Sequence, residues 1–286
     1  MPPPTVRPLK ATCTSWSWSL LPFERVAQIM SLLGFRAIDL GAFAGWAHYE
    51  PGILASRPEA MAQEIGQISQ RYEMALTDMI VTFGTGLVEK CVNFPDRGVR
   101  DANLETFKGL AEFCHYAGIP GITLCPGVEH ASLGRASSLQ LAMDELARLA
   151  EAGKQADLRV SFEPHAESIT ESPEDALQAV QQVPHLSLTL DYSHFAYLGY
   201  SDQEIEPLVP YAGHFHVRQA KSGVLQCRTT EGQIDFERAL TRLQECGYDG
   251  WVAFEYVWEQ WLENDRVDVL SETLILRRQL ARFFDS

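Results

Sequence analysis

Short apolar runs alternate along this chain with longer segments in which apolar residues recur every three or four positions. The runs predict β-strands at residues 11–18, 36–40, 75–81, 121–125, 158–163, 186–191, 212–217 and 250–255. The longer segments predict amphipathic helices at residues 22–33, 58–72, 102–117, 137–153, 173–182, 202–208, 235–246 and 266–283. Eight strands, each followed by a helix, are typical of a (β/α)₈ barrel with parallel strands.

Local signals agree with this division. Ser172 precedes Pro173 and two acidic residues, a pattern typical of a helix start, and Gly247 follows a predicted helix as a C-terminal cap. A doubly wound open sheet would also alternate, but it predicts a glycine-rich phosphate turn after an early strand, and none follows residues 11–18. We therefore expect an α/β protein with one TIM barrel domain over residues 1–286, residues 1–10 being an N-terminal extension.

Acidic residues or a histidine close four successive strands in the second half of the chain. These residues are Glu163, Asp191, His216 and Glu255. With a period of two, each lies on the face opposite the bulky apolar residues of its own strand, and in a barrel that face is the interior. Because the last inward residue of each strand lies at the mouth, we expect the four side chains to meet there.

The composition of this set predicts a divalent-metal site. Three converging carboxylates would repel one another in a partly desolvated mouth, and a bound cation removes that cost. Oxygen donors with one imidazole and no thiolate favour Mn²⁺, with Mg²⁺, Co²⁺ and Zn²⁺ as alternatives. His214 points the same way as His216 but one layer deeper, so it is either a hydrogen-bonded interior residue or a further site residue.

Other candidate residues surround the predicted ligands. His165, His194 and Arg218 lie just beyond strand ends, where they could bind substrate. Asp39 and His48 are weaker candidates, and Trp16 and Trp18 either stack on a sugar ring or pack in the core. Two long segments after strands, residues 41–57 and 218–234, predict lids over the mouth.

Charge and composition narrow the partners. The net charge is −15, with no run of lysine or arginine, which disfavours nucleic acid and anionic membranes. No apolar run reaches membrane-spanning length and the N-terminus lacks a signal-peptide core, so we expect a soluble cytoplasmic protein. The six cysteines form no CxxC pair, which predicts reduced and mostly buried thiols.

With these residues in place, the chain resembles the sugar-phosphate isomerase/epimerase family, the xylose-isomerase-like TIM barrels. The segments SFEPHAES, LTLDYSHF, HFHVRQA and EGQIDFERAL…GYDGWVAFEYV carry the resemblance. It implies metal binding by the four strand-end residues, substrate binding by His194 and a homodimer. Ketose 3-epimerases have a glutamate and an arginine where this chain has Ile169 and Ser222, and the extra zinc-binding histidines of endonuclease IV are missing.

The chemistry that follows has two versions. In the first, an isomerase or epimerase acts on a keto sugar through an enediolate, with Glu163 and Glu255 as the acid/base pair and His194 and Arg218 holding substrate oxygens. In the second, a lyase starts with the same proton abstraction and then expels a β-substituent. It would be a keto-cyclitol dehydratase or an eliminase on an oxidised 3-keto-glycoside, with His165 as the acid for the leaving group. A barrel that binds a sugar or metal without turnover is a third, non-enzymatic alternative.

Overall fold

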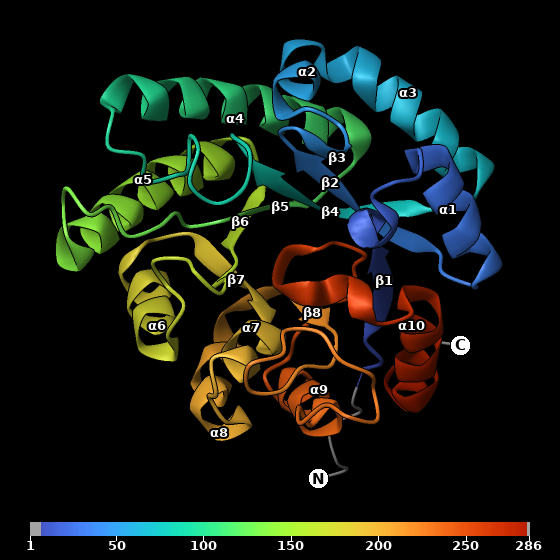
Figure 1. Cartoon of the computed structure of the whole chain (residues 1–286). Helices are drawn as coiled ribbons and strands as arrows, with labels where there is room; N and C mark the ends of the chain where they lie inside the picture. The colour runs from blue at the N-terminus through green and yellow to red at the C-terminus, as the bar shows by residue number, and fades with distance from the viewer. Residues whose placement is uncertain (1–6, 285–286) are drawn as a thin grey trace, which may run out of the picture.

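Eight parallel strands close into a barrel that is surrounded by helices (Figure 1). The computed structural model describes residues 7–284. In chain order, the barrel strands are β1 (Lys10–Thr14), β2 (Ala37–Phe43), β4 (Ala75–Thr82), β5 (Gly121–Leu124), β6 (Arg159–Phe162), β7 (Leu186–Asp191), β8 (Ala212–Val217) and β9 (Trp251–Phe254). Pairing of β1 with both β2 and β9 closes the ring. The predicted single-domain TIM barrel is confirmed.

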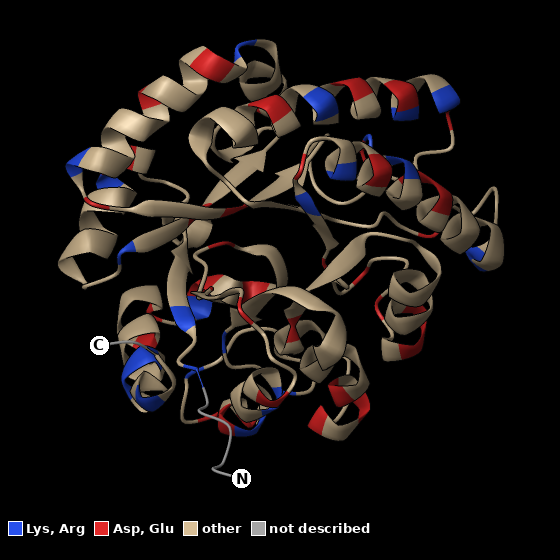
Figure 2. Ribbon diagram, turned by 180° about the vertical axis from the view of Figure 1, so that it is seen from behind, with Lys and Arg blue, Asp and Glu red and all other residues tan. Residues whose placement is uncertain are grey.

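Helices cover the outside of the barrel. The principal ones are α1 (Phe23–Leu32), α2 (Pro51–Ser56), α3 (Pro58–Arg71), α4 (Arg97–Ala117), α5 (Arg135–Gln155), α6 (Pro173–Gln182), α9 (Phe236–Glu245) and α10 (Val269–Gln279). Their apolar faces pack on the outward side chains of the strands and form the main core, as Phe107 of α4 and Phe162 of β6 do. Acidic and basic residues are interspersed along their outer faces (Figure 2). No helix within residues 7–284 combines the length and apolarity needed to cross a bilayer.

The first predicted strand is too long. β1 ends at Thr14, and Ser15–Trp18 form a 3-10 helix, η1, instead of continuing the strand. Hydroxyl groups explain the break: the Thr14 Oγ1 lies 2.7 Å from the Ser17 Oγ, and the Ser15 Oγ accepts a bond from the Gly41 backbone. The turn carries Trp16 over the barrel mouth. Residues 1–6 of the predicted N-terminal extension lie outside the described residues, and Lys10 already belongs to β1.

Several short elements follow the strands and were not predicted. They are β3 (Trp46–His48), α2, α7 (Tyr192–Tyr197), and the 3-10 helix η3 (Trp261–Arg266). The predicted helix at 202–208 is a short α8 (Asp202–Ile205) followed by the 3-10 helix η2 (Glu206–Tyr211), in which Pro210 prevents a regular α-helix. A last 3-10 turn, η4 (Ala281–Phe283), ends the described chain.

The barrel interior beneath the mouth is polar. Hydroxyl pairs bridge neighbouring or facing strands, including Thr12 with Thr77 at 2.9 Å and Thr123 with Thr189 at 2.6 Å. The Thr77 hydroxyl also donates to Asp39. These buried groups hydrogen-bond to one another and form a polar layer directly below the strand-end side chains.

Candidate metal centre at the barrel mouth

The structure brings the four strand-end side chains together. Glu163, Asp191, His216 and Glu255 each contribute one ligand-type atom, and these atoms all lie within 4.8 Å of one another. All four residues are buried. Asp191 and His216 are register partners on β7 and β8. The Glu163 and Glu255 amides bond to Leu124 and Val217, which extends the parallel pairing one residue past the strand ends.

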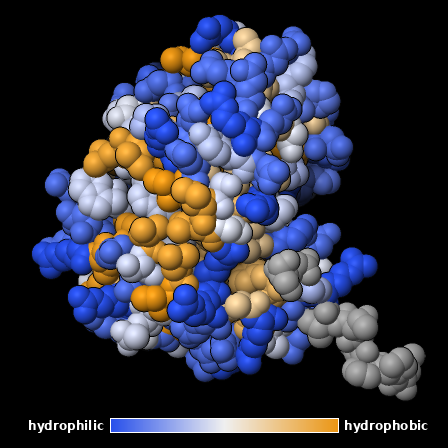
Figure 3. All heavy atoms as spheres, turned by 90° about the vertical axis from the view of Figure 1, so that its right-hand side faces the viewer, coloured by the Kyte–Doolittle hydropathy of each residue, from blue (hydrophilic) through white to orange (hydrophobic). Residues whose placement is uncertain are grey.

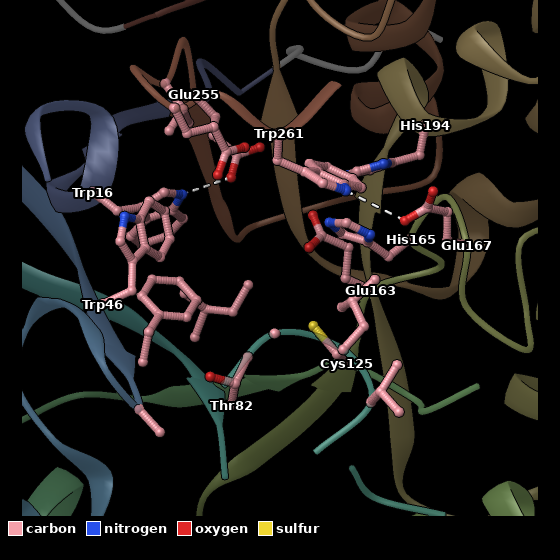
Figure 4. Close-up of a pocket in the computed structure, with 18 of the residues that line it drawn as sticks. Trp16, Trp46, Thr82, Cys125, Glu163, His165, Glu167, His194, Glu255 and Trp261 are labelled. Carbon is pink, nitrogen blue, oxygen red and sulfur yellow. Dashed lines mark hydrogen bonds between the residues drawn. The ribbon is translucent and has the colours of Figure 1, made fainter. Parts of the chain in front are cut away.

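Neighbouring groups fix the orientation of each candidate ligand. The His216 Nδ1 lies 3.0 Å from the Glu163 Oε1 and 3.1 Å from the Glu255 Oε2. The Trp16 Nε1 donates to the Glu255 Oε1 at 2.9 Å, as Figure 4 shows. Asp191 caps α7 and accepts bonds from the Ser193 backbone and hydroxyl. Glu163 and Glu255 thus flank the imidazole nitrogen of His216, and Ser193 fixes the carboxylate of Asp191.

The electrostatics of the cluster reflect burial and close charges. Burial raises the pKa of Asp191 to about 7, although Arg218 opposes the shift. Burial also opposes ionisation of Glu255 and His216. The attraction between opposite charges outweighs burial in both cases. His216 and Arg218 lower the pKa of Glu255, and Glu255 and Glu163 raise the pKa of His216 well above its usual value.

Arg218, predicted as a substrate clamp, supplies a positive charge beside the cluster. It is 3 % exposed, its guanidinium donates to the Ser193 Oγ at 2.9 Å and to the Asp191 Oδ2 at 3.1 Å, and the Glu255 Oε2 lies 3.7 Å away. With a protonated His216 and a proton on Asp191, Arg218 and the imidazolium balance Glu163 and Glu255. Once Asp191 and His216 lose these protons, three carboxylates face one arginine, and a bound cation would supply the missing charge.

The donor set fits a divalent cation. The Glu255 Oε2 is buried in the cluster. The His216 Nδ1 lies 3.1 Å from it but without hydrogen-bond geometry, so no group among residues 7–284 donates a hydrogen bond to this oxygen. An unsatisfied buried carboxylate oxygen is costly, and coordination would satisfy it. Three carboxylates and one imidazole nitrogen match the ligands that hard and borderline divalent ions prefer.

His165 and His194 lie side by side at the edge of the cluster, with ring centroids 3.9 Å apart. The Ala166 backbone orients both: its amide donates to the His194 Nδ1 at 3.2 Å, and its carbonyl lies 2.8 Å from the His165 Nδ1. Burial lowers the pKa of both histidines, that of His194 strongly. Both rings are therefore neutral, and the His165 Nε2 is an acceptor.

A cavity of about 450 Å³ opens above the cluster. Its lining includes Glu163, Glu255, His165, His194 and Arg218, whereas Asp191 and His216 lie beneath. In Figure 4, Trp16 and Trp46 border one side of the cavity, and His165, His194 and Trp261 border the other. All three residues predicted to bind substrate therefore reach the space where a substrate would lie.

The weaker candidates have structural partners instead. The His214 Nε2 lies 2.7 Å from the Asp39 Oδ2, one layer below His216, so both are hydrogen-bonded interior residues. Ligand-type atoms of Asp39 and His214 also lie within 4.8 Å of one of His216, but the close pairing of Asp39 with His214 accounts for both residues. The His48 Nε2 lies 2.9 Å from the Ser15 carbonyl and holds the β3 hairpin in place.

One of the two predicted lids borders the cavity. Phe43, Ala44 and Trp46 of the 41–57 segment line it, but of residues 218–234 only Arg218 does. The rest of that segment braces the loop after β9 from behind, because the Gln226 amide bonds to the backbone of Val257 and Asn264. Trp261 and Glu259 of this braced loop complete the cavity wall.

Sequence reasoning missed these residues of the loop after β9. Trp261 stacks on His165 with ring centroids 4.9 Å apart, and its indole donates to Glu167 at 3.3 Å. Glu259 accepts a bond from Asn264, and burial raises its pKa. The loop lacks apolar periodicity, so its sequence gave no indication that these side chains face the cavity.

Comparison with known proteins agrees with the fold. An inosose dehydratase of Geobacillus kaustophilus (strain HTA426) is 25% identical over 233 residues, 68% of this chain and 75% of that protein. The IOLI protein with a bound zinc atom superposes with a TM-score of 0.74 at 15% identity, over 97% of this chain and 100% of that one. The E. coli 3-keto-D-glucoside 4-epimerase superposes with a TM-score of 0.71 at 13% identity, over 96% and 99% of the two chains.

A family match covers most of the chain. Residues 27–279 match the family model described as xylose isomerase-like TIM barrel. The matched range includes every strand of the barrel except β1 and all four candidate metal ligands. The chain therefore belongs to the xylose isomerase-like TIM barrel family.

Proposed function

We propose that this protein is a divalent-metal-dependent isomerase or epimerase acting on a keto sugar or a related polyol. One observation carries the proposal: of the four clustered ligand-type side chains, Glu163 and Glu255 also line the cavity. A carboxylate that both touches the ion and faces the substrate can move a proton at the carbon next to a carbonyl.

The bound ion would supply Lewis-acid polarisation of the substrate carbonyl and its neighbouring hydroxyl. Glu163 and Glu255 flank the His216 Nδ1, and the substrate carbon would lie between them. One glutamate, in its ionised form, would remove the α-proton. The other would enter the reaction protonated and give that proton to the enediolate, so that the two glutamates exchange protonation states. Trp16 holds one Glu255 oxygen by a hydrogen bond and leaves the other free. His194 and Arg218 would hold substrate oxygens and balance the developing charge.

For the native ion we propose Mn²⁺, since three carboxylates and one imidazole without thiolate suit it. The zinc atom in the IOLI protein makes Zn²⁺ the main alternative, and Mg²⁺ and Co²⁺ also suit oxygen donors. Metal analysis of the purified protein, followed by reconstitution of the chelated protein with each ion, decides among them.

A lyase is the second candidate, and the similarity to an inosose dehydratase supports it. It needs a proton donor for the leaving group. The hydrogen bond from His165 to the Ala166 carbonyl makes its Nε2 an acceptor, which disfavours the histidine as that donor. Glu259 suits the role better, because it faces the cavity and burial raises its pKa.

Proton NMR in D₂O with a panel of keto sugars and keto-cyclitols tests both readings. An isomerase or epimerase incorporates deuterium at the α-carbon and yields an isomer without loss of water or of a substituent. An unsaturated or dehydrated product would instead establish the lyase. A protein that binds the metal but exchanges no α-proton in any of these compounds would be a non-enzymatic barrel.

Variants test the metal centre itself. We expect Glu163→Gln and Glu255→Gln each to lower exchange at least about a hundredfold and to reduce metal content. Glu151→Gln, on the outer face of α5, serves as the matched control, because Glu151 is exposed and distant in the fold from the mouth. If both glutamine variants kept metal and exchange at the control level, the metal assignment would be wrong.

A further inference from the structure

A small apolar cluster at the barrel mouth is separate from the main core. Trp16, Phe43, Ile80 and Val257 form it, and Trp46 packs against it. All five residues line the cavity. They come from η1, the end of β2, β3, β4 and the loop after β9. This apolar wall therefore belongs to the site. The proposed proton transfer uses only the indole N–H of Trp16, which bonds to Glu255, and gives the apolar surface of the wall no role.

The β3 hairpin places the outermost ring of the wall. Ala47 and His48 adopt φ values of 51° and 27°, which residues other than glycine rarely take. The bond between His48 and the Ser15 carbonyl holds the reversal. It sets Trp46 against Phe43, with ring centroids 4.7 Å apart, and leaves Trp46 half-buried beside the cavity (Figure 4).

Outside the apolar wall, most of the charged residues that line the cavity are acidic. Glu163, Glu167, Glu255 and Glu259 all line it. Among the described lining residues, Arg218 is the one lysine or arginine, and Asp191 already engages it. A phosphate would meet these carboxylates without a free cation to bind it. The cavity therefore suits an uncharged substrate with two different faces, one polar and one apolar.

Its size also suits more than a free sugar. A volume of about 450 Å³ lies within the roughly 300–1,000 Å³ typical of sites for drug-sized ligands. A sugar ring at the glutamates would leave the wall of Trp46 and Phe43 uncovered. Exposed apolar surface in a cavity is a site for apolar ligand groups, and aromatic rings stack well on tryptophan.

We propose that the substrate is an unphosphorylated glycoside with a ketone on its sugar ring, whose apolar, ring-containing substituent packs on the wall of Trp16, Phe43, Trp46, Ile80 and Val257. The sugar part of this assignment rests on the proposed function. The substituent part rests on the wall alone. Trp46 is the specificity-determining residue, because it is the least buried aromatic ring of the wall and it extends the wall outward.

Calorimetric titration of the metal-loaded protein with matched glucosides tests the substituent. The probes are the phenyl and methyl D-glucopyranosides of both anomers, glucose and glucose 6-phosphate. We expect the phenyl glucoside of one anomer to bind at least about tenfold more tightly than its methyl counterpart. We expect glucose 6-phosphate to bind no more tightly than glucose. Equal affinity for the phenyl and methyl compounds, including no binding of either, or tighter binding of the phosphate, overturns the proposal.

Variants of Trp46 test whether the apolar wall causes the preference for the phenyl glucoside. Trp46→Ala should reduce the phenyl-to-methyl affinity ratio to below about threefold, with metal content as in the unchanged protein. Trp46→Phe, which keeps a ring, should retain an intermediate ratio. Trp258→Ala is the control, because Trp258 is 38 % exposed and lies outside the cavity lining. An unchanged ratio in a folded Trp46→Ala protein contradicts the assignment.

The two proposals fail separately. If keto compounds exchange their α-protons but the phenyl preference is missing, the proposed function stands and the glycoside assignment falls. If the phenyl preference depends on Trp46 but no keto compound exchanges, the wall binds ligand and the proposed reaction is wrong.

Discussion

Trp16 joins the apolar wall to the candidate metal centre through one hydrogen bond. Its indole N–H, 2.9 Å from the Glu255 Oε1, is the donor that holds this glutamate in place. We expect Trp16→Phe to lower the rate of α-proton exchange about tenfold or more, because a hydrogen bond to a charged group contributes roughly 1.5–3 kcal/mol. Single-turnover exchange measured with Trp258→Phe as control checks this. Wild-type exchange in Trp16→Phe would mean that the bond does not position Glu255.

Metal affinity should depend on pH through Asp191. Burial raises the pKa of this residue to about 7, so the metal-free folded protein holds a proton there at pH 6. Because the folded protein binds this proton more tightly than the unfolded chain does, protonation of Asp191 stabilises the metal-free fold. This stabilisation is fully present below the ordinary pKa of 3.8 and is lost as pH rises through about 7. Because the metal needs the carboxylate, Mn²⁺ should bind about tenfold more tightly at pH 8 than at pH 6.

The raised pKa of His216 acts in the same direction, since a protonated imidazole cannot coordinate. Calorimetry in buffers of different ionisation enthalpy measures the protons that are released. Affinity independent of pH between 6 and 8, without proton release, would contradict the prediction.

Residue positions at the strand ends could be predicted, and those in loops could not. The period-two pattern was enough to bring Glu163 and Glu255 to one mouth, because a parallel barrel aligns the ends of its strands. It also ranked His216 above His214, which pairs with Asp39. No sequence pattern predicts the position of Trp261, because its loop takes its shape from contacts with residues distant in the sequence, such as the stacking of Trp261 on His165.

On the scale of elements, α4 and α5 are joined by a buried ion pair. Arg100 of α4 bonds to Glu145 of α5 at 3.0 Å, and its guanidinium also satisfies the carbonyls of Phe94 and Pro95. We expect Arg100→Ala to lower the free energy of unfolding by about 3 kcal/mol, because it removes a buried bond to Glu145 and leaves two carbonyls unpaired, while Arg148 remains paired with Glu145. Urea denaturation measures this loss.

Arg97 provides the control on the same helix. It pairs with Asp101 in an exposed i,i+4 arrangement, so Arg97→Ala should cost at most about 0.5 kcal/mol. Equal losses in the Arg97 and Arg100 variants would show that burial does not set the strength of these pairs.

The regular elements could be predicted from periodicity, and the short ones that build the mouth could not. The strand predicted over 11–18 stops at Thr14 because serine and threonine hydroxyls bond locally. β3 depends on positive φ at Ala47 and His48, residues that ordinarily avoid it. The six-residue α7 begins where Asp191 caps it, a role masked by its position as a predicted metal ligand.

On the scale of the whole molecule, the cysteine thiols differ in how far they are buried, and we expect their reactivity to differ accordingly. All six cysteines are free, and Cys246 is the exposed one. Burial raises the pKa of Cys91 and Cys227 to about 11 and that of the other three well above the usual range. Since the thiolate is the reactive form, we expect one rapidly reacting thiol in the native protein and six after denaturation.

Ellman's reagent counts these thiols. Cys246→Ser should remove the fast phase and leave five thiols in denaturant. A second fast thiol in the native protein would mean that one of the buried sites opens readily.

Exposed apolar side chains also gather outside the mouth. Leu20 and Leu32 are 74% and 80% exposed near the two ends of α1, and Ile275 on α10 is 46% exposed. Figure 3 shows hydrophobic side chains gathered on the face that α1 and α10 help to form. The predicted homodimer remains a proposal, and sedimentation equilibrium tests it.

The two ends of the described chain meet where the barrel closes. The Leu9 amide donates to the Phe283 carbonyl at 2.7 Å, and Leu9 forms a parallel bridge with Phe284. A short linker could therefore join these ends, and new termini could be opened in an exposed loop such as the turn at Leu133 and Gly134 before α5. Such a circular permutant would keep every strand neighbour of the barrel while changing which βα unit leaves the ribosome first.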